Sequence, residues 1–269
     1  MSQSLFIKPK ELFMDVVNPK DYVHIDSVSN MYQSLKATVQ KPLKMILLYG
    51  RPGTGKSMLL NKLHADLSKH QKVLMIDIPI IDESDFLHVI AHKMYGYPHK
   101  DAITLTYFLE LAKEANYSPT PIVLLDEAQL YSSALMEKIR LISDARALKF
   151  VITLHKTDDE DVIAKEHFQT RIWESIELQN ATPEELKIYI QKKLLKGNCF
   201  DVANMINDQN IHDIAKFTRG NYREANKLMF ALFSLYAWLE EHQPKKVSYK
   251  ALKKKYIEMA AIHTRLIHA

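Results

Sequence analysis

The chain of 269 residues has little cysteine, little glycine and no long apolar run. Its single cysteine, Cys199, excludes an internal disulfide and any metal site built from several cysteines. The longest apolar run, residues 228–239, is shorter than the ~20 residues that cross a bilayer. The first ten residues carry two lysines and lack the apolar stretch of a secretory signal. We therefore expect a soluble, cytoplasmic protein with no membrane span.

Glycine is scarce but clustered. Only six glycines occur, and three of them lie within residues 50–55. Such a cluster indicates a loop that needs unusual backbone geometry. Apolar residues make up 47% and charged residues 25% of the chain, as in ordinary globular proteins, which excludes a disordered chain.

The charge is unevenly distributed. The whole chain carries +4, whereas residues 245–269 alone hold seven basic side chains and one acid. The rest of the chain is therefore net negative, which excludes a generally basic surface. We expect a basic C-terminal helix, whose cluster Lys245–Lys255 is either a solvated face or a contact for DNA phosphates.

Short apolar runs alternate with helical patterns up to residue 178, and this alternation predicts a parallel five-stranded sheet flanked by helices. An α/β fold is thus expected. Ser84 is expected to cap the helix over residues 85–95. Strands are expected over residues 44–49, 72–78, 121–125, 150–154 and 174–178. Helices are expected over residues 26–39, 56–70, 85–95, 105–115, 132–145 and 161–168.

The pattern becomes wholly helical after residue 179, starting at Thr182-Pro183, a typical helix start. Helices are expected over residues 184–195, 211–217, 223–241 and 248–263. We therefore divide the chain into a lead-in (1–40), an α/β core (41–180) and an all-α lid domain (181–269). The run 228–239 is apolar all round, which is typical of a buried helix, although a partner-docking surface is the alternative.

The glycine cluster belongs to a phosphate-binding motif. Residues 50–57 read Gly-Arg-Pro-Gly-Thr-Gly-Lys-Ser and fit G-x-x-x-x-G-K-[ST] between an expected strand and helix. In this motif backbone N–H groups surround phosphate oxygens, the lysine reaches the terminal phosphates and the serine ligates Mg²⁺. The expected ATP-binding residues are Gly50, Arg51, Pro52, Gly53, Thr54, Gly55, Lys56, Ser57 and Met58.

Two acids complete this motif. Asp126 and Glu127 end an apolar strand about 70 residues after the phosphate loop, at the expected carboxyl edge of the sheet. Asp126 is expected to position Mg²⁺, and Glu127 to orient the attacking water as the general base. The presence of Glu127 disfavours a protein that binds nucleotide without hydrolysing it.

These residues resemble a known family. The sequence is similar to AAA+ ATPases, particularly the ExeA/GspA type of secretion and pilus ATPases, and more distantly to origin-recognition and transposition ATPases. The resemblance covers nearly the whole chain, and Asp-Glu-Ala-Gln at 126–129 is its most specific part beside the phosphate loop. Supporting segments are residues 18–23, 135–143, 168–172, 176–178 and 220–227.

The resemblance implies further roles. Tyr22 and Val23 would flank the adenine, and Arg223 would be a lid arginine that senses the γ-phosphate. Arg171 would act as an arginine finger toward a neighbouring subunit, which implies a homo-oligomer formed on ATP binding. Surface or structural arginines are the alternative for both positions.

A polar residue near the end of the fourth strand should also sense the γ-phosphate. The resemblance implies His155 for this role, with Thr153 and Lys156 as alternatives. A histidine at a strand end is often only a surface residue.

Two functions remain open. One is an ATPase switch that remodels or assembles a protein complex, with unidentified protein partners, in secretion or pilus biogenesis. The other is a DNA-associated switch of the initiator, loader or transposition type. The ExeA-like residues favour the first, and the basic cluster Lys245–Lys255 favours the second. Both require ATP and Mg²⁺.

Overall fold

A computed structural model describes residues 4–98, 103–155 and 172–268. Contacts divide the chain into two compact units. The sheet unit comprises residues 30–52 and 56–178, and the helical unit comprises residues 1–29, 53–55 and 179–269. Among the described residues, none of the helices combines the length and apolar character needed to cross a membrane.

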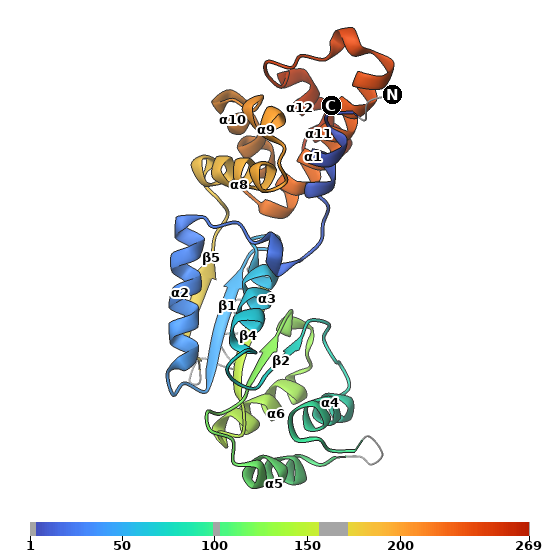
Figure 1. The fold of residues 1–269 in the computed structure, drawn as a ribbon. Coiled ribbons are helices and arrows are strands. Elements are labelled where there is room, and N and C mark those ends of the chain that lie inside the picture. The colour runs from blue at the N-terminus through green and yellow to red at the C-terminus, as the bar shows by residue number, and fades with distance from the viewer. Residues whose placement is uncertain (1–3, 99–102, 156–171, 269) are drawn as a thin grey trace. The chain divides into compact units, whose positions relative to one another are not determined.

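The sheet unit contains five parallel strands, as the sequence predicts, and their order in the sheet is β2-β3-β4-β1-β5 (Figure 1). Strand β4 thus lies between β3 and β1, so that three carboxyl ends meet at one edge of the sheet. The strands are β1 (Met45–Gly50), β2 (Val73–Ile76), β3 (Ile122–Leu125), β4 (Lys149–His155) and β5 (Ile172–Leu178).

Helices flank this sheet, and polar side chains fix where several of them begin. Thr104 and Ser132 accept hydrogen bonds from the first turns of their helices. Asp82, rather than the expected Ser84, is the cap of α4, so that helix begins one residue before Ser84. The helices are α2 (Asp26–Gln40), α3 (Lys56–Leu67), α4 (Glu83–Tyr95), α5 (Leu105–Ala115), η2 (Ala128–Leu130) and α6 (Ser133–Asp144).

The core of the sheet unit explains the short apolar runs. All four residues of β3 are buried, as are the five central residues of β4. A strand covered by helices on both faces has no solvent face, so its sequence is apolar throughout. The expected helix over residues 161–168 lies outside the described residues.

The helical unit is built from helices at both ends of the chain. Thr182 and Glu185 form a reciprocal capping box at the start of α8, where the sequence predicts a helix start. Asn207 and Asn210 form a second one at α10. The elements are α1 (Ile7–Leu12), η1 (Pro19–Asp21), α8 (Pro183–Lys196), α9 (Phe200–Asn204), α10 (Asp208–Thr218), α11 (Tyr222–His242), η3 (Pro244–Lys246) and α12 (Lys254–His263).

The N-terminal segment contributes aromatic side chains to the core of this unit. Phe6 and Phe13 are buried, and their rings lie 6.3 Å and 5.7 Å from the ring of Phe233 on α11. The ring of Tyr236 lies 4.8 Å from Phe6. Residues that precede the sheet unit in sequence therefore complete the core of the helical unit.

The basic C-terminal helix is shorter than the sequence predicts. It begins at Lys254, not at residue 248. The backbone N–H of Leu252 donates to Met205 O at 3.1 Å, and the backbone N–H of Lys253 donates to the Tyr236 hydroxyl at 2.7 Å. The side chain of Asn210 donates to Leu252 O at 3.1 Å. These contacts hold residues 252–253 in a non-helical conformation.

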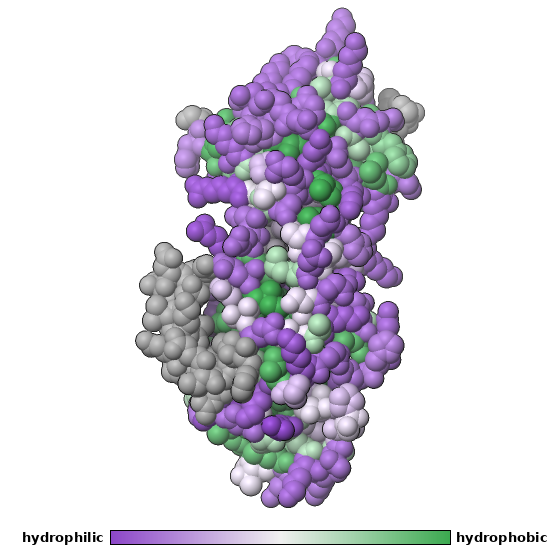
Figure 2. Space-filling model, turned by 90° about the vertical axis from the view of Figure 1, so that its left-hand side faces the viewer, coloured by the Kyte–Doolittle hydropathy of each residue, from purple (hydrophilic) through white to green (hydrophobic). Residues whose placement is uncertain are grey.

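The apolar run 228–239 is buried on one face only. Its inward side chains belong to the core of the helical unit, whereas Phe230 and Trp238 on α11 are 37% and 47% exposed. On the face of the molecule shown in Figure 2, hydrophilic residues predominate and hydrophobic residues form small separate patches.

Candidate active site

The candidate site lies where β1, β3 and β4 end. Gly50, the first residue of the phosphate loop, is paired in register with His155 at the end of β4. Leu125, the last residue of β3, is paired with Ile152, so Asp126 follows level with Thr153. The strand order thus brings together residues that lie up to about 100 positions apart in sequence.

The phosphate loop connects β1 to α3 and has the backbone that its glycines allow. Gly53 and Gly55 have φ angles of 82° and 98°, in the region that side chains disfavour. A Cβ atom at Gly55 would meet no atom within 4 Å. The need for glycine there is therefore conformational, and the space beside it is open.

Lys56 is the first residue of α3 and is only 4% exposed. Its ammonium donates to Gly50 O at 2.8 Å and to Arg51 O at 3.0 Å, so the buried charge lies over the loop. Ser57 and Met58 follow in the first turn and are half-buried, whereas Arg51 and Pro52 are exposed. The helix N-terminus and the ammonium together suit an anionic phosphate.

Asp126 is buried directly after β3, and its position is fixed from several sides. Its backbone N–H donates to Ile76 O at 3.0 Å. Its Oδ1 atom accepts from the Thr153 hydroxyl and, at 3.1 Å, from the backbone N–H of Glu127. A carboxylate held in this way beside a phosphate loop is a suitable oxygen ligand for Mg²⁺.

Glu127 has a left-handed backbone, with φ 51° and ψ 45°. Its N–H also donates to Thr153 Oγ1 at 3.0 Å, so Thr153 holds both acids of the pair. The Glu127 side chain is 40% exposed, and its Oε1 atom lies 3.8 Å from Nε2 of His155. Uncommon backbone conformations of this kind concentrate at functional sites.

His155 and Thr153 occupy different places in this site. The buried Thr153 contacts the side chain of Asp126 and the backbone of Glu127, whereas His155 contacts the side chains of Glu127 and Gln129. Gln129 ends the Asp-Glu-Ala-Gln segment, and the sequence motifs alone indicate no role for its side chain. Lys156 and Arg171, the remaining candidates in this part of the chain, lie outside the described residues.

The expected adenine-flanking residues belong to the helical unit. Tyr22 and Val23 are buried and follow the short helix η1, which Asn18 caps by accepting from the N–H of Lys20. The Tyr22 ring lies edge-on to His24, with 5.0 Å between the ring centroids. Burial raises the pKa of the Tyr22 hydroxyl, so the phenol is neutral at physiological pH.

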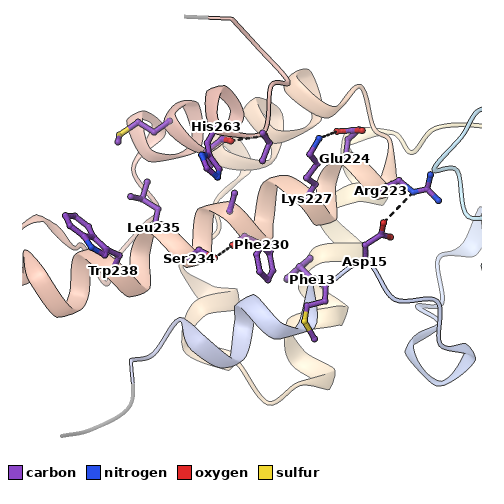
Figure 3. Close-up of a pocket in the computed structure, with 15 residues that line it drawn as sticks. Phe13, Asp15, Arg223, Glu224, Lys227, Phe230, Ser234, Leu235, Trp238 and His263 are labelled. Atoms are coloured by element: carbon purple, nitrogen blue, oxygen red, sulfur yellow. Dashed lines mark hydrogen bonds and ion pairs between the residues drawn. The ribbon is translucent and has the colours of Figure 1, made fainter.

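Arg223 is the second residue of α11 and lies two positions after the cap Asn221. The Nε atom of Arg223 lies 3.9 Å from Oδ2 of Asp15, and Figure 3 shows the two side chains pointing toward each other. Both side chains are more than half exposed, so this ion pair contributes little to stability.

A groove of about 960 Å³ runs beside Arg223 along α11 (Figure 3). Phe13, Phe230 and Trp238 are among its apolar lining residues, and Lys227 and Glu224 form an ion pair at 3.9 Å on its rim. The groove lies wholly within the helical unit.

The basic cluster Lys245–Lys255 extends from η3 to the first turn of α12. It contains six lysines and no acid. Lys254 is within 4.0 Å of Asp213 and 3.9 Å of Glu258, and the Lys253 ammonium donates to Lys246 O. Lys245, Lys246 and Lys250 are exposed.

Comparisons with known proteins agree with this geometry. Residues 40–157 match the family described as "AAA domain". A search of curated proteins finds no match.

Several solved structures have a similar fold. The Cdc6 protein of Pyrobaculum aerophilum is 16% identical, with a TM-score of 0.63 over 95% of this chain and 71% of that one. The Aeropyrum pernix ORC1 protein, solved in complex with DNA, is 14% identical, with a TM-score of 0.65 over 94% of this chain and 69% of that one. The Thermotoga maritima RuvB branch migration motor is 17% identical, with a TM-score of 0.58 over 92% of this chain and 72% of that one.

Proposed function

We propose that this chain, whose residues 40–157 match an AAA domain, is a P-loop ATPase of the AAA+ type that binds and hydrolyses Mg-ATP as a conformational switch. One observation carries the proposal. Lys56, Asp126 and Glu127 gather at a single edge of the sheet, where Thr153 holds both acids. This is the set of groups that phosphoryl transfer to water requires.

Ser57 and Asp126 would hold Mg²⁺. The buried, hydrogen-bonded carboxylate of Asp126 and the hydroxyl at the start of α3 are hard oxygen ligands, which suit this ion. When bound, the ion neutralises charge that develops on the phosphates.

The chain's own residues have separate roles in hydrolysis. Lys56 binds the terminal phosphates, exchanging its carbonyl contacts at Gly50 and Arg51 for phosphate oxygens. Glu127 accepts the proton of the attacking water as the water oxygen bonds to the γ-phosphorus and the bond to the β-phosphate oxygen breaks. ADP and phosphate are the products.

Further residues keep the roles that the family resemblance gives them. Tyr22 and Val23 flank the adenine, and Arg223 responds to the γ-phosphate. Arg171 acts on the nucleotide of a neighbouring copy, so turnover is slow in the monomer and faster in a homo-oligomer. Loss of the γ-phosphate contacts on hydrolysis changes the state of the switch.

The switch acts on a protein complex that it remodels or assembles, and the ExeA-like segments favour secretion or pilus biogenesis. A second candidate is action on DNA. It is favoured by the exposed lysines of the acid-free cluster Lys245–Lys255. The names of the ORC1 and RuvB relatives, which refer to DNA and to a Holliday junction, agree with this candidate.

ATP turnover by three variants tests the hydrolytic function. Lys56→Ala should lose ATP binding, whereas Glu127→Gln should bind ATP and fail to hydrolyse it. Glu110→Gln on the exposed face of α5 is the control and should match the unmodified chain. Rapid hydrolysis by Glu127→Gln would remove Glu127 as the base.

Salt dependence tests the DNA candidate. For binding that depends on phosphate contacts, the logarithm of the binding constant falls linearly with the logarithm of the salt concentration. The slope is about one unit for each phosphate contact. Replacing Lys245, Lys246 and Lys250 by alanine should reduce that slope, and replacing the exposed Lys69 and Lys113 should not. A slope unaffected by the first set would contradict DNA binding through this cluster.

A further inference from the structure

Gln129 contacts His155 at two points. The backbone N–H of His155 donates to Oε1 of Gln129 at 3.3 Å, and Nε2 of Gln129 lies 3.3 Å from Nδ1 of His155. A backbone N–H can only donate, so the Gln129 atom facing it must be the amide oxygen. The other end of the amide, which faces the imidazole, is therefore an NH₂ group.

This orientation determines the tautomer of the histidine. An NH₂ group can only donate, so Nδ1 of His155 must accept. The neutral imidazole then carries its hydrogen on Nε2. That nitrogen lies 3.8 Å from Oε1 of Glu127, longer than a hydrogen bond but within ion-pair distance.

We propose that Gln129 and His155 are positioning residues that orient the general base Glu127. Gln129 keeps the hydrogen of His155 on Nε2, and this N–H directs one carboxylate oxygen of Glu127, which leaves the other to receive the proton from water. The proposal rests on the proposed ATPase function, and it assigns to Gln129 a role in the site.

Two features of the fold support this role. The backbone of Glu127 is held by Thr153 and Asp126, yet its side chain is 40% exposed and needs a partner that limits its rotation. His155 is suitably placed, because β4 lies between β3 and β1 and His155 is paired with Gly50 of the phosphate loop. Catalytic hydrogen bonds are often long before substrate binds and shorten in the complex.

The replacement Gln129→Glu tests the pair, because it keeps size and shape. A carboxylate still accepts from the His155 N–H, but it presents a second acceptor to Nδ1. The imidazole, now flanked by two carboxylates, is favoured in its charged form, in which both nitrogens carry hydrogen and the positive charge lowers the basicity of Glu127. We expect kcat for ATP to fall about tenfold or more, with ATP affinity and Tm unchanged.

Replacements of His155 give a second, graded test. Glutamine can place an amide N–H near the position of Nε2, whereas asparagine reaches only the position of Nδ1. His155→Gln should therefore retain more turnover than His155→Asn or His155→Phe, with ATP affinity equal in all three. Equal loss in the three variants would contradict a role for the Nε2 hydrogen.

The tautomer itself can be measured without any turnover. In the ¹⁵N spectrum of the full chain labelled at histidine, the His155 signals are those that disappear in His155→Gln. We expect an Nε2–H imidazole in the unmodified chain and a different state in Gln129→Glu. An Nδ1–H signal in the unmodified chain would overturn the inference.

The two measurements separate this inference from the ATPase proposal. A chain with the Nε2–H signal that never hydrolyses ATP leaves the tautomer assignment standing and contradicts the ATPase. An active ATPase whose kcat is unchanged by Gln129→Glu contradicts the orienting role alone.

Discussion

The hydroxyl of Thr153, fully buried in β4, donates to Oδ1 of Asp126 and accepts from the backbone N–H of Glu127. One small side chain on the neighbouring strand therefore fixes both the metal-binding acid and the backbone of the base. An oxygen buried among apolar strands is costly unless it is hydrogen-bonded in this way.

Replacing Thr153 by valine keeps the shape and removes both hydrogen bonds. We expect stability to fall by about 1–3 kcal/mol, because a buried acceptor loses its donor. The Mg²⁺ concentration needed for half-maximal turnover should rise, since Asp126 is less well held. Thr153→Ser, which keeps the hydroxyl, is the control, and magnesium titrations of turnover compare the two. An unchanged magnesium requirement in Thr153→Val would argue against this role.

Gly220 lies so close to Ala181 that a side chain cannot fit. Its φ is 72°, and an added Cβ atom would be 2.0 Å from Ala181 O. Gly96, with φ 73° and no atom within 4 Å of such a Cβ, is a matched control. Gly96→Ala should cost about 1–2 kcal/mol from backbone strain alone.

Gly220→Ala should lower the free energy of unfolding clearly more than the control Gly96→Ala does, because Ala181 must also move. The amides in α11 should then exchange their hydrogens faster, because the helical unit is less stable. Equal exchange rates in the two variants would mean that the helical unit accommodates the extra methyl group.

Lys193 is a half-buried lysine on α8. Its ammonium lies 3.2 Å from both the Tyr189 hydroxyl and Asn226 Oδ1. Burial lowers its pKa to about 8, against the opposing effect of Asp21 and Asp15. The unfolded chain, with an ordinary lysine pKa near 10.4, binds more protons between these pH values. The stability of the native protein should therefore rise with pH from about 8 to about 10.

Lys193→Met should remove this dependence. Tyr189 keeps its 2.8 Å hydrogen bond to Asn226, so no buried polar atom is abandoned there. We expect the variant to be more stable than the unmodified chain by about 1–3 kcal/mol at pH 7, with the difference shrinking toward pH 10. Urea unfolding at pH 7, 8.5 and 10 measures this, with the exposed Lys192→Met as control. A difference that is constant with pH would show that Lys193 titrates normally.

Arg223 offers a test that separates function from stability. Its ion pair with Asp15 is exposed, so Arg223→Ala should change Tm very little. If Arg223 responds to the γ-phosphate, the same variant should lose about tenfold or more in ATP turnover. Asp15→Asn removes the ion pair and should keep full turnover. Similar turnover in both variants would leave Arg223 as an ordinary surface arginine.

Local sequence signals predicted the parallel sheet well, and the phosphate loop and the acid pair stay predictions made from local motifs. Motifs such as Gly50–Ser57 depend on neighbours in sequence, and the buried strands need apolar residues throughout. The Gln129–His155 contact could not be found in this way, because it depends on which strand lies beside which and in what register.

Tertiary contacts account for the remaining differences between the helices that the sequence predicts and those in the structure. The C-terminal helix begins late because Met205, Asn210 and Tyr236 bind the backbone of residues 252–253. The α11 run is apolar all round, yet the part of the chain that the structure describes covers only one of its faces, and Phe230 and Trp238 are exposed. Composition alone does not report which face of a helix is covered.

The aromatic residues that flank α1 also affect the order in which the protein folds during synthesis. Phe6 and Phe13 find their partners on α11, more than 200 residues later in synthesis. The growing chain therefore holds an unpaired apolar segment at its start until residue 236 has left the ribosome, while the sheet unit between them can already fold. The helical unit is completed last, and a nascent chain arrested before α11 would carry a folded sheet unit with an exposed, aggregation-prone N-terminus.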